Sequence, residues 1–434
     1  MATDEKKSVR GTDISKRAEV IRNWEDFLNK YMGICNADEY DEVKNPNGYI
    51  NLGTAVNNMC RDIIVPRLTS PHVWECNLDL LQYREGYGIL KLRKALATVM
   101  TEFLCTHEPV DPEDLICVVG VTACLDILAH CLADPGEVIL APTPIYGRIY
   151  TDFMQRAEVK LWPIPIISKE NDELSPILNI EKVKKAYEDA ISQKQVVKAL
   201  ILLNPSNPLG DIYSSELLMD IFTFCNEHDL HVIMDEVYAL SIFNGSPEFH
   251  SALKFPTLPN KNKLHVLYGI SKDFGIAGLR IGAIHTRCKP LKNCLRQLSF
   301  FHDIPFPVMD IAAKFLEDLD WLKKYLSINR QRITDKFKES LDYCRRMGLN
   351  VRASAGGFFL WLDFRPICGS SSFEQERDFF LYLIEKAHLY IVPGEELFCA
   401  QPGWFRLTFT ANPDHVNAGL KRLEEAIKNY SKKV

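Results

Sequence analysis

The chain has 434 residues, of which 47% are hydrophobic and 25% are charged, and its formal net charge is −6. This composition is typical of a globular protein with a large core, and the small excess of acidic residues gives no electrostatic reason to expect a nucleic acid as a partner. Because no run of about 18 apolar residues occurs, the sequence predicts neither a transmembrane helix nor a membrane partner.

Two features of the sequence indicate the compartment. Residues 1–20 lack the apolar segment of a secretory signal peptide. The 13 cysteines include no C-x-x-C pair, and a chain with a large core does not need disulfides for stability. We therefore expect a cytoplasmic protein with reduced, mostly buried thiols.

The first two thirds of the sequence alternate between helical and strand patterns. Residues 1–50 are polar with one predicted helix at 21–31, and a second helix is predicted over 89–106, where apolar residues recur at helical spacing. Continuous apolar strands separated by helices predict a parallel sheet covered on both faces, with ligands bound beyond the carboxyl ends of the strands. The predicted strands cover 115–119, 137–141, 196–203, 231–234, 264–268 and 279–285, and the helices between them cover 123–132 and 214–228.

The pattern changes near residue 305. A long helical region covers 308–347 with a break near Asp318, and a final amphipathic helix covers 413–430. Mixed helices and short strands indicate a second, α+β domain. Its predicted strands are 357–363, 389–392 and 404–410.

A strand signal at 49–52 suggests that both ends of the chain build the second domain. We therefore expect residues 1–59 to join the small domain and residues 60–305 to form the large domain. Residues 306–434 then complete the small domain.

Lys272 and Asp235 each follow an apolar strand. Burial of the Lys272 amine near Arg280 would lower its pKa, and a neutral amine can form a Schiff base, although most lysines in turns lie at the surface. A carboxylate at the end of an apolar strand needs a cationic partner, such as the protonated ring nitrogen of a pyridoxal cofactor. For Asp235 alone, an exposed loop residue or a helix cap is the more common situation.

A candidate phosphate site lies at 120–123, where Gly-Val-Thr-Ala opens a predicted helix directly after a strand. Free backbone N–H groups and the helix dipole at such a turn favour an anion, although any strand-to-helix turn has this pattern. Arg280 can clamp the same phosphate, and a surface salt bridge is the alternative for it.

Four further residues at predicted strands have side chains suited to a planar ring or to an anion. Tyr146 can stack on a ring or pack in the core, and Asn207 and Tyr238 can hydrogen-bond a ring hydroxyl. Arg406 interrupts an apolar strand, where its charge needs an anion such as a substrate carboxylate unless the strand lies at an edge.

The motifs of several other enzyme classes do not occur in the sequence. It contains no G-x-G-x-x-G, no Walker A motif, no H-E-x-x-H and no G-x-S-x-G. The 11 histidines show no metal-ligand spacing, so no metal is expected.

Five segments together resemble a known family. They are APTPIYG at 141–147, NPSNPLG at 204–210, DEVY at 235–238, SKDFGIAGLRIG at 271–282 and PGWFR at 402–406. In this order they resemble the fold-type I pyridoxal-phosphate enzymes of the class I aminotransferase group. More narrowly, the sequence is similar to the 1-aminocyclopropane-1-carboxylate (ACC) synthase-like family in its animal form, from about residue 50 to the end.

The resemblance implies an α/β, fold-type I transferase that depends on pyridoxal 5′-phosphate (PLP). Its large domain would have a mostly parallel seven-stranded sheet covered by helices, beside a smaller α+β domain from both chain ends. In such enzymes the residue matching Lys272 forms the Schiff base and then acts as general acid and base. The residue matching Asp235 holds the pyridinium nitrogen, and those matching Asn207 and Tyr238 hydrogen-bond the ring oxygen, so Lys272, Tyr238 and Asp235 are the implied catalytic residues.

The other implied roles concern the phosphate, the ring face and the substrate. By resemblance, Arg406 and Asn207 bind the substrate α-carboxylate, and Tyr146 stacks on the ring. Tyr83, in a Tyr-x4-Gly pattern that ends at Gly88, reaches the phosphate of a neighbouring subunit, which implies a homodimer with shared active sites. The phosphate of the chain's own cofactor is held by Val121, Thr122, Ser271 and Arg280.

Three positions depart from the family pattern. Gly269 stands where a phosphate-binding serine is usual, and Gly86 stands where plant ACC synthases have a tyrosine. Val56 occupies the place of a substrate-binding glutamate, so a carboxylate that could meet a sulfonium or ammonium group is missing.

The function that we expect is transamination of an L-α-amino acid with a 2-oxo acid acceptor. The same apparatus can instead carry out ACC synthase-type γ-elimination on S-adenosylmethionine, or β-elimination from a cysteine conjugate, because the leaving group and the pocket decide the outcome. A non-catalytic regulatory protein with the PLP fold is an alternative of another class.

Overall fold

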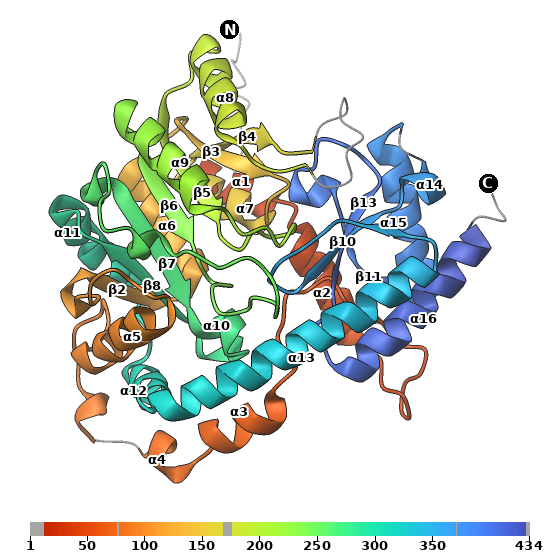
Figure 1. Ribbon diagram of the computed structural model, residues 1–434, viewed down its shortest axis with the longest axis horizontal. Helices are drawn as coiled ribbons and strands as arrows, with labels where there is room; N and C mark the ends of the chain where they lie inside the picture. The colour runs from red at the N-terminus through yellow and green to blue at the C-terminus, as the bar shows by residue number, and fades with distance from the viewer. Residues whose placement is uncertain (1–12, 76–77, 168–175, 370, 431–434) are drawn as a thin grey trace, which may run out of the picture.

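The computed structural model describes residues 13–75, 78–167, 176–369 and 371–430. Figure 1 shows a large lobe, in which helices cover both faces of a twisted sheet, and a smaller lobe at the C-terminal side. Helix α13 (Leu319–Arg346) runs beneath both lobes. The predicted fold class is confirmed, whereas the exact domain boundaries stay a prediction.

One sheet of seven strands forms the large lobe, in the order β2-β8-β7-β6-β5-β3-β4. Strand β8 (Ile281–Thr286) is antiparallel to both of its neighbours, and all other neighbours are parallel. The sequence pattern does not predict β4 (Lys160–Pro165), because it contains two prolines, which strands tolerate at a sheet edge. The other strands are β2 (Leu115–Val119), β3 (Val138–Thr143), β5 (Val197–Leu203), β6 (His231–Asp235) and β7 (Leu264–Gly269).

Each buried strand contributes alternate residues to two hydrophobic cores. In β2, Leu115 and Cys117 belong to one core, and Ile116 and Val118 belong to the other. This alternation explains why the strands are continuously apolar in sequence. The helices on the first face are α5 (Leu90–Phe103), α8 (Ile180–Ser192) and α9 (Ser215–Glu227), and those on the second are α6 (Val121–Leu132), α7 (Arg148–Met154) and α11 (Lys289–Leu298).

The small lobe combines both ends of the chain. Strand β1 (Ile50–Asn51) pairs in parallel with β11 (Leu389–Tyr390), and four more strands form a sheet in the order β12-β13-β10-β9. The single strand predicted at 389–392 is wrong, because it is divided between β11 and β12, which belong to different sheets. The four strands are β9 (Asn350–Val351), β10 (Phe359–Asp363), β12 (Val392–Pro393) and β13 (Trp404–Thr408), and helices α15 (Phe373–Ala387) and α16 (Pro413–Tyr430) pack nearby.

Capping residues decide where two of the predicted helices begin. The carboxylate of Asp318 accepts the N–H of Trp321 at 3.0 Å, so the break expected there separates α12 (Phe306–Leu316) from α13. The helix predicted at 21–31 is wrong, because Asp26 caps a new helix.

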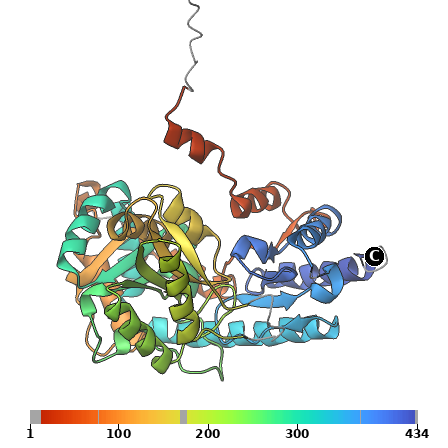
Figure 2. The same ribbon diagram turned by 90° about the horizontal axis from the view of Figure 1, so that it is seen from above.

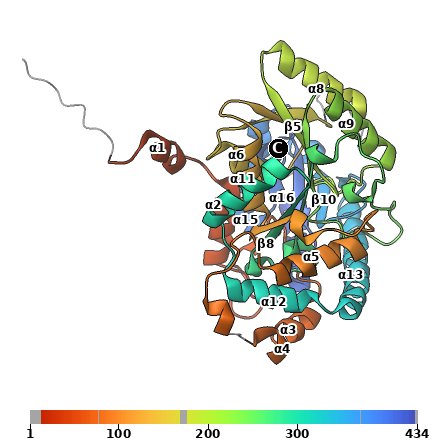
Figure 3. The ribbon, with the colours of Figure 1, turned by 90° about the vertical axis from the view of Figure 1, so that its left-hand side faces the viewer.

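The N-terminal part instead contains two helices, α1 (Lys16–Arg22) and α2 (Phe27–Ala37). Helix α1 buries none of its residues, and Figures 2 and 3 show it projecting from the body of the molecule.

The remaining elements are short. Four are α-helices: α3 (Arg61–Leu68), α4 (Pro71–Trp74), α10 (Ile270–Asp273) and α14 (Arg365–Cys368). The others are 3₁₀ turns at Leu78–Leu81, Pro112–Asp114, Ala252–Lys254, Lys261–Lys263, Ala277–Leu279, Ser299–Phe301 and Glu395–Leu397.

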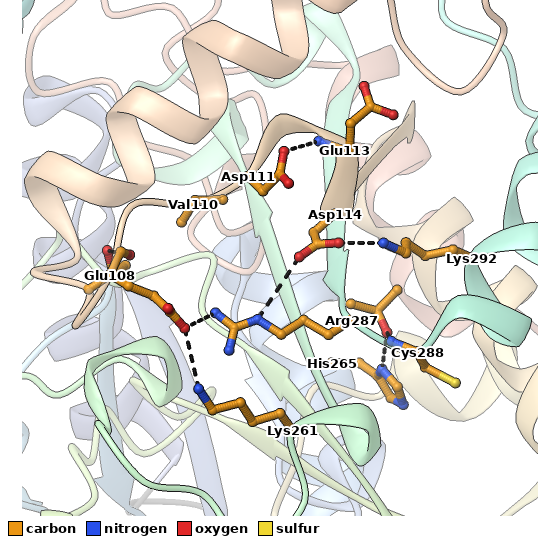
Figure 4. A network of polar contacts seen from close by, with 12 residues as sticks. Glu108, Val110, Asp111, Glu113, Asp114, Lys261, His265, Arg287, Cys288 and Lys292 are labelled. Atoms are coloured by element: carbon orange, nitrogen blue, oxygen red, sulfur yellow. Dashed lines mark hydrogen bonds and ion pairs between the residues drawn. The ribbon is translucent and has the colours of Figure 1, made fainter.

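An ion-pair network joins the segments at the amino ends of the parallel strands (Figure 4). Arg287, after β8, contacts Glu108 at 2.5 Å and Asp114 at 3.9 Å, and Lys292 of α11 also contacts Asp114. This network ties α11 and β8 to the chain before β2, away from the end of the sheet where a ligand is expected.

Two further expectations concern the cysteines and the membrane. Most of the described cysteines are buried, and all of those are free thiols. Across the described residues, no helix is both long and apolar enough to cross a bilayer.

Candidate active site

A cavity of about 230 Å³ lies at the carboxyl ends of the parallel strands. Segments that follow β3, β5, β6 and β7 reach it, as does the start of α6, so residues far apart in the sequence meet there. It brings together nine residues that the sequence analysis selected: Val121, Thr122, Tyr146, Asn207, Asp235, Tyr238, Ser271, Lys272 and Arg280.

Lys272 reaches this cavity from α10, the short helix that follows β7. Its Nζ atom donates a hydrogen bond of 2.7 Å to the carbonyl oxygen of Ala55. Burial and the positive charges of Arg406 and Arg280 lower the pKa of the amine to about 8, although the carboxylate of Asp235 opposes them. A substantial fraction of the amine is therefore neutral, and nucleophilic, near neutral pH.

Asp235, the last residue of β6, is 5% exposed. Its Oδ1 atom accepts the N–H of Val237 at 3.2 Å. Burial raises the pKa of the carboxyl to about 7, against the effects of that N–H and of the positive charge of Lys272. A buried carboxyl with so few donors is suited to pairing with a cationic N–H group.

The start of α6 has the features of an anion site. Gly120 precedes the helix with φ of 86°, a conformation that favours glycine, and no side chain caps the first turn. The guanidinium of Arg280 lies beside this turn, where Nη2 donates to the carbonyl of Val119 at 3.4 Å. A Cβ atom on Gly282 would lie 2.6 Å from the nitrogen of Val121, so the neighbouring strand can approach the turn only because this residue is glycine.

Arg406 lies behind the cavity in β13 and is 1% exposed. Its Nη1 atom donates to Oδ1 of Asn207 at 2.8 Å, and its Nη2 atom donates to the carbonyl of Gly53. Within the described residues, its buried Nε atom has no hydrogen-bond partner and no carboxylate pairs with it. The edge-strand alternative is wrong, because β13 lies between β12 and β10. A buried cation without an anion is suited to a substrate carboxylate.

Aromatic side chains define the ring end of the cavity. Tyr238 is 2% exposed, and the edges of the Phe358 and Phe359 rings meet it at centroid distances of 5.1 and 5.6 Å. Tyr146 also lines the cavity, in a segment whose Ile145 N–H donates to the carbonyl of Leu397 at 2.8 Å. The small lobe thus holds the segment that carries Tyr146.

Besides Arg406, two of the selected residues do not line this cavity. The side chain of Val56 packs against the hydrophobic core, and its carbonyl accepts the hydroxyl of Thr410 at 2.6 Å, so Ala55 rather than Val56 reaches the cavity. Tyr83 is 98% exposed and contributes nothing to the cavity of its own chain.

Asp152 is a cavity residue that the sequence analysis did not select. It is 7% exposed and accepts a hydrogen bond of 3.0 Å from Nε of Arg148. Burial raises the pKa of its carboxyl to about 7, while Arg148 and the hydroxyl of Thr122 oppose the shift. Its position between Ile149 and Phe153 on the buried face of α7 is the signal that could have identified it.

The cavity fits the cofactor that the sequence resemblance implies. The Lys272 amine, whose pKa is lowered, matches the aldehyde of PLP, and the buried Asp235 carboxyl matches its ring nitrogen. The uncapped start of α6, with Arg280 beside it, matches its phosphate. The neighbouring Arg406, whose Nε atom is unpartnered, provides for an additional carboxylate. These residues are therefore able to hold PLP and an amino acid side by side.

Comparison with known proteins agrees with this geometry. The family described as Aminotransferase class I and II matches residues 55–426. ACC synthase-like protein 1 of Mus musculus is 34% identical over 424 residues, which cover 97% of this chain and 84% of the relative. ACC synthase of Nicotiana tabacum is 30% identical over 403 residues, covering 90% and 81% of the two chains. A protein named probable inactive ACC synthase-like protein 2, also of Mus musculus, is 32% identical over 399 residues, covering 91% and 69%.

Solved structures show the same fold. An aromatic aminotransferase from Pyrococcus horikoshii superposes with a TM-score of 0.74 at 22% identity, covering 93% of this chain and 99% of the other. An aspartate aminotransferase from Thermotoga maritima also gives 0.74, at 19% identity, covering 96% and 100%. The fold-type I architecture implied by the sequence resemblance is confirmed, and so is the similarity to the ACC synthase-like family.

Proposed function

The chain belongs to the class I and II aminotransferase family, whose cofactor is PLP, and we propose that it is an active enzyme that transaminates an L-α-amino acid to a 2-oxo acid through Lys272. The observation that carries this proposal is the meeting of the Lys272 amine, the Asp235 carboxyl and the Arg406 guanidinium around one site at the strand ends. Asp235 and Arg406 are buried and Lys272 is half-buried, and none of the three forms an ion pair among the described residues.

When bound, PLP supplies an aldehyde that condenses with amines and a ring that withdraws electrons from the substrate Cα atom. Arg406 and Asn207 bind the substrate α-carboxylate and orient the Cα–H bond. The neutral Nζ atom of Lys272 removes the proton from Cα and returns it at the cofactor carbon. Asp235 holds the proton of the ring nitrogen, which keeps the ring electron-withdrawing.

Other residues position the cofactor. The N–H groups at Val121 and Thr122, the hydroxyl of Ser271 and the guanidinium of Arg280 bind the phosphate. Tyr146 stacks on the ring, and Tyr238 and Asn207 donate hydrogen bonds to the ring oxygen. Asn207 and Tyr238 are buried, which limits the access of water to the ring end of the cavity.

ACC synthase-type γ-elimination on S-adenosylmethionine is the second candidate reaction, and the 30% identity to the tobacco ACC synthase favours it. The segment Gly53–Asn57 weighs against it, because its residues Gly, Thr, Ala, Val and Asn include no carboxylate for a sulfonium group. β-Elimination from a cysteine conjugate needs no such carboxylate and is the alternative lyase reaction.

A non-catalytic role in regulation is the candidate of another class. Two mammalian relatives are named as probable inactive ACC synthase-like proteins. Lys272, Asp235 and Arg406 are all present here, and the Lys272 amine has the lowered pKa that catalysis needs, so we favour an active enzyme.

We propose further that the protein is a cytoplasmic homodimer. Leu81 and Tyr83 are 65% and 98% exposed, and Phe300 and Phe301 are 74% and 73% exposed, which leaves large apolar side chains for a second copy to cover. Tyr83 would then serve the phosphate site of the partner, where Gly269 supplies no hydroxyl group.

A visible spectrum of the purified holoenzyme tests the proposed function. Addition of an L-α-amino acid should replace the absorbance of the lysine-bound cofactor with that of pyridoxamine phosphate, and a 2-oxo acid should restore it. Release of methylthioadenosine from S-adenosylmethionine would instead establish γ-elimination, and release of pyruvate and ammonia from a cysteine conjugate would establish β-elimination. A lysine-bound band that is absent, or that persists in Lys272→Ala, would refute the catalytic role.

A further inference from the structure

Asp273 is a buried carboxyl that the proposed chemistry does not use. It directly follows Lys272 in α10 and is 0% exposed, but it does not line the cofactor cavity. A carboxylate removed from water needs donors for its oxygens, so its contacts indicate its role.

The side chain of Asp273 joins the lysine segment to the segment that carries Tyr238. Its Oδ1 atom accepts the hydroxyl of Ser241 at 2.6 Å, and its Oδ2 atom accepts the N–H of Leu240 at 3.1 Å. The hydroxyl of Tyr268, in β7, donates to Oδ2 at 3.4 Å. Leu240 and Ser241 follow Tyr238 closely, so one carboxyl connects the two strand ends that supply the amine and the phenol.

The main chain at the same place is held from the other side. The carbonyl of Asp273 accepts the hydroxyl of Tyr325 at 2.9 Å and the amide of Asn329 at 3.4 Å, both from α13. The amide of Asn57 donates to the carbonyl of Lys272 at 3.3 Å and to Oδ1 of Asn329 at 3.1 Å. The backbone that carries the lysine is therefore bonded to α13 and to the segment before α3.

Ser241 extends these contacts to the small lobe. Its carbonyl accepts the N–H of Gly357 at 2.9 Å, two residues before β10, and its own N–H donates to the carbonyl of Tyr238 at 2.9 Å. Asp273 thus lies where the lysine segment, the tyrosine segment, α13 and the small lobe meet.

We propose that Asp273 is a positioning residue, which fixes the Nζ atom of Lys272 relative to the ring of Tyr238 and the cofactor between them. The inference rests on the proposed role of Lys272 and goes beyond it, because Asp273 does not line the cofactor cavity. Its two oxygens accept hydrogen bonds from Leu240 and Ser241, which follow Tyr238, whereas its own backbone belongs to the segment that carries Lys272. An amide cannot replace it fully, because an amide has one acceptor oxygen, and its NH₂ group cannot accept both the N–H of Leu240 and the hydroxyl of Ser241 in place of the second.

The charged and titratable groups around Asp273 come from three elements and from Tyr238, which follows β6. Tyr268 belongs to β7, Tyr325 and Arg330 belong to α13, and Lys272 precedes it in α10. Burial raises the pKa of Asp273 to about 7, while its hydrogen bonds and the more distant Arg330 lower it. Neutral donors thus provide most of the stabilisation of this carboxyl, and their geometry matters more than net charge.

The test uses the holoenzyme and the variant Asp273→Asn. The circular dichroism of the cofactor band reports how rigidly the lysine-bound ring is held, and a structural role alone would not change it in a folded protein. We expect this signal to fall by at least about half and kcat to fall about 100-fold, with KM changed less than about twofold, because the reacting atoms are displaced rather than lost. Ser241→Ala removes one donor and should produce a smaller change in the same direction.

Glu376→Gln is the matched control. Glu376 is also a fully buried carboxyl that accepts two backbone N–H groups, those of Glu395 and Gly403, but it lies in α15 of the small lobe. The Glu376→Gln variant should have lower thermal stability than the wild type and an unchanged dichroism of the cofactor band.

The outcomes separate the two proposals. A folded Asp273→Asn enzyme with unaltered dichroism and kcat would overturn the positioning role while leaving the proposed function intact. If Asp273→Asn does not fold, a Ser241→Ala enzyme with unaltered dichroism and kcat would overturn the positioning role in the same way. Wild-type protein without a lysine-bound cofactor band would overturn both.

Discussion

The Nη1 atom of Arg406 donates a hydrogen bond of 2.8 Å to Oδ1 of Asn207, across 199 positions of the sequence. Arg406 belongs to the small-lobe sheet and Asn207 to the segment after β5 of the large sheet, so the contact joins the two lobes beside the cofactor cavity. The proposed binding of a substrate carboxylate at this pair would therefore be linked to the packing of the lobes.

Replacement of Arg406 by lysine tests the substrate-carboxylate site. The change keeps the positive charge that lowers the pKa of Lys272 but loses the planar, two-pronged donor set. We expect kcat/KM to fall about 100-fold for the amino acid and for the 2-oxo acid, while the cofactor spectrum stays unchanged. Steady-state kinetics with both substrates measure this.

Arg422→Lys is the matched control for that variant, since the Arg422 guanidinium contacts the backbone carbonyls of Pro46 and Gly48 in the small lobe, away from the cavity. Its kinetics should equal those of the wild type. Equal losses in both variants would contradict a specific role for Arg406.

The pKa of Lys272 predicts how cofactor uptake depends on pH. Below a pKa of about 8 the amine is protonated and cannot attack the aldehyde, whereas above it the amine is neutral. The rate at which apoprotein forms the lysine-bound band should rise about tenfold per pH unit below this value and level off above it. Stopped-flow absorbance between pH 6 and 9 measures the rate, and a flat profile would contradict the prediction.

Gly282→Ala should disrupt the phosphate site. A Cβ atom there would lie 2.4 Å from the carbonyl carbon of Gly120 and 2.6 Å from the nitrogen of Val121, so the turn that we propose to bind the phosphate must move. We expect about 1–3 kcal/mol lower stability and weaker PLP binding. Denaturant unfolding and a PLP titration of the apoprotein measure the two effects.

Gly278→Ala, four residues earlier in the chain, is the control for Gly282→Ala. A Cβ atom on Gly278 would have no atom within 4 Å, so Gly278→Ala should bind PLP as the wild type does. If both alanine variants bind PLP normally, the close approach at Gly282 is not required for the phosphate site.

Two adjacent histidines, the half-buried His231 and the fully buried His265, predict loss of stability in mild acid. Nδ1 of His231 and Nε2 of His265 lie 2.8 Å apart, and Nδ1 of His265 lies 2.9 Å from the hydroxyl of Thr286, close to the ion pairs in Figure 4. Burial lowers the pKa of His231 to about 4 and that of His265 well below its ordinary range. Both rings are therefore neutral in the folded protein at neutral pH.

Because the unfolded chain binds these protons near pH 6.5 and the folded chain does not, the free energy of unfolding falls as the pH drops from about 6.5 towards 4. His265→Gln should reduce this acid-induced loss of unfolding free energy by about 1–3 kcal/mol, whereas a substitution of the exposed His107 should not reduce it. Urea unfolding at pH 7.5 and pH 5 measures the difference, and identical slopes in all three proteins would contradict the assignment.

Local patterns in the sequence were sufficient to predict the buried strands and the polar residues at their ends. Continuous apolar runs identify β2, β5, β6 and β7 because both faces of a covered parallel sheet are buried. Polar residues at the ends of such runs, Asp235 and Lys272 among them, must then meet at one edge of the sheet. The resemblance of the surrounding segments added their roles and the cofactor.

Other features could not be read from local patterns. Strand β4 contains prolines, and its pairing with β3 depends on its position at the edge of the sheet. Ala55 has no distinctive sequence context, and only the folded chain brings Ala55 and Asp152 to the cavity.

By itself, the sequence determined the α/β class, the order of the buried strands along the chain and the polar residues that follow them, because these depend on periodicity and on short motifs. Only the tertiary structure decided that the Arg406 guanidinium meets Asn207 and that Asp273 bonds to the segment after Tyr238. Each of these contacts joins residues far apart in the sequence, through side-chain packing between elements, and no local pattern encodes which buried polar groups will pair.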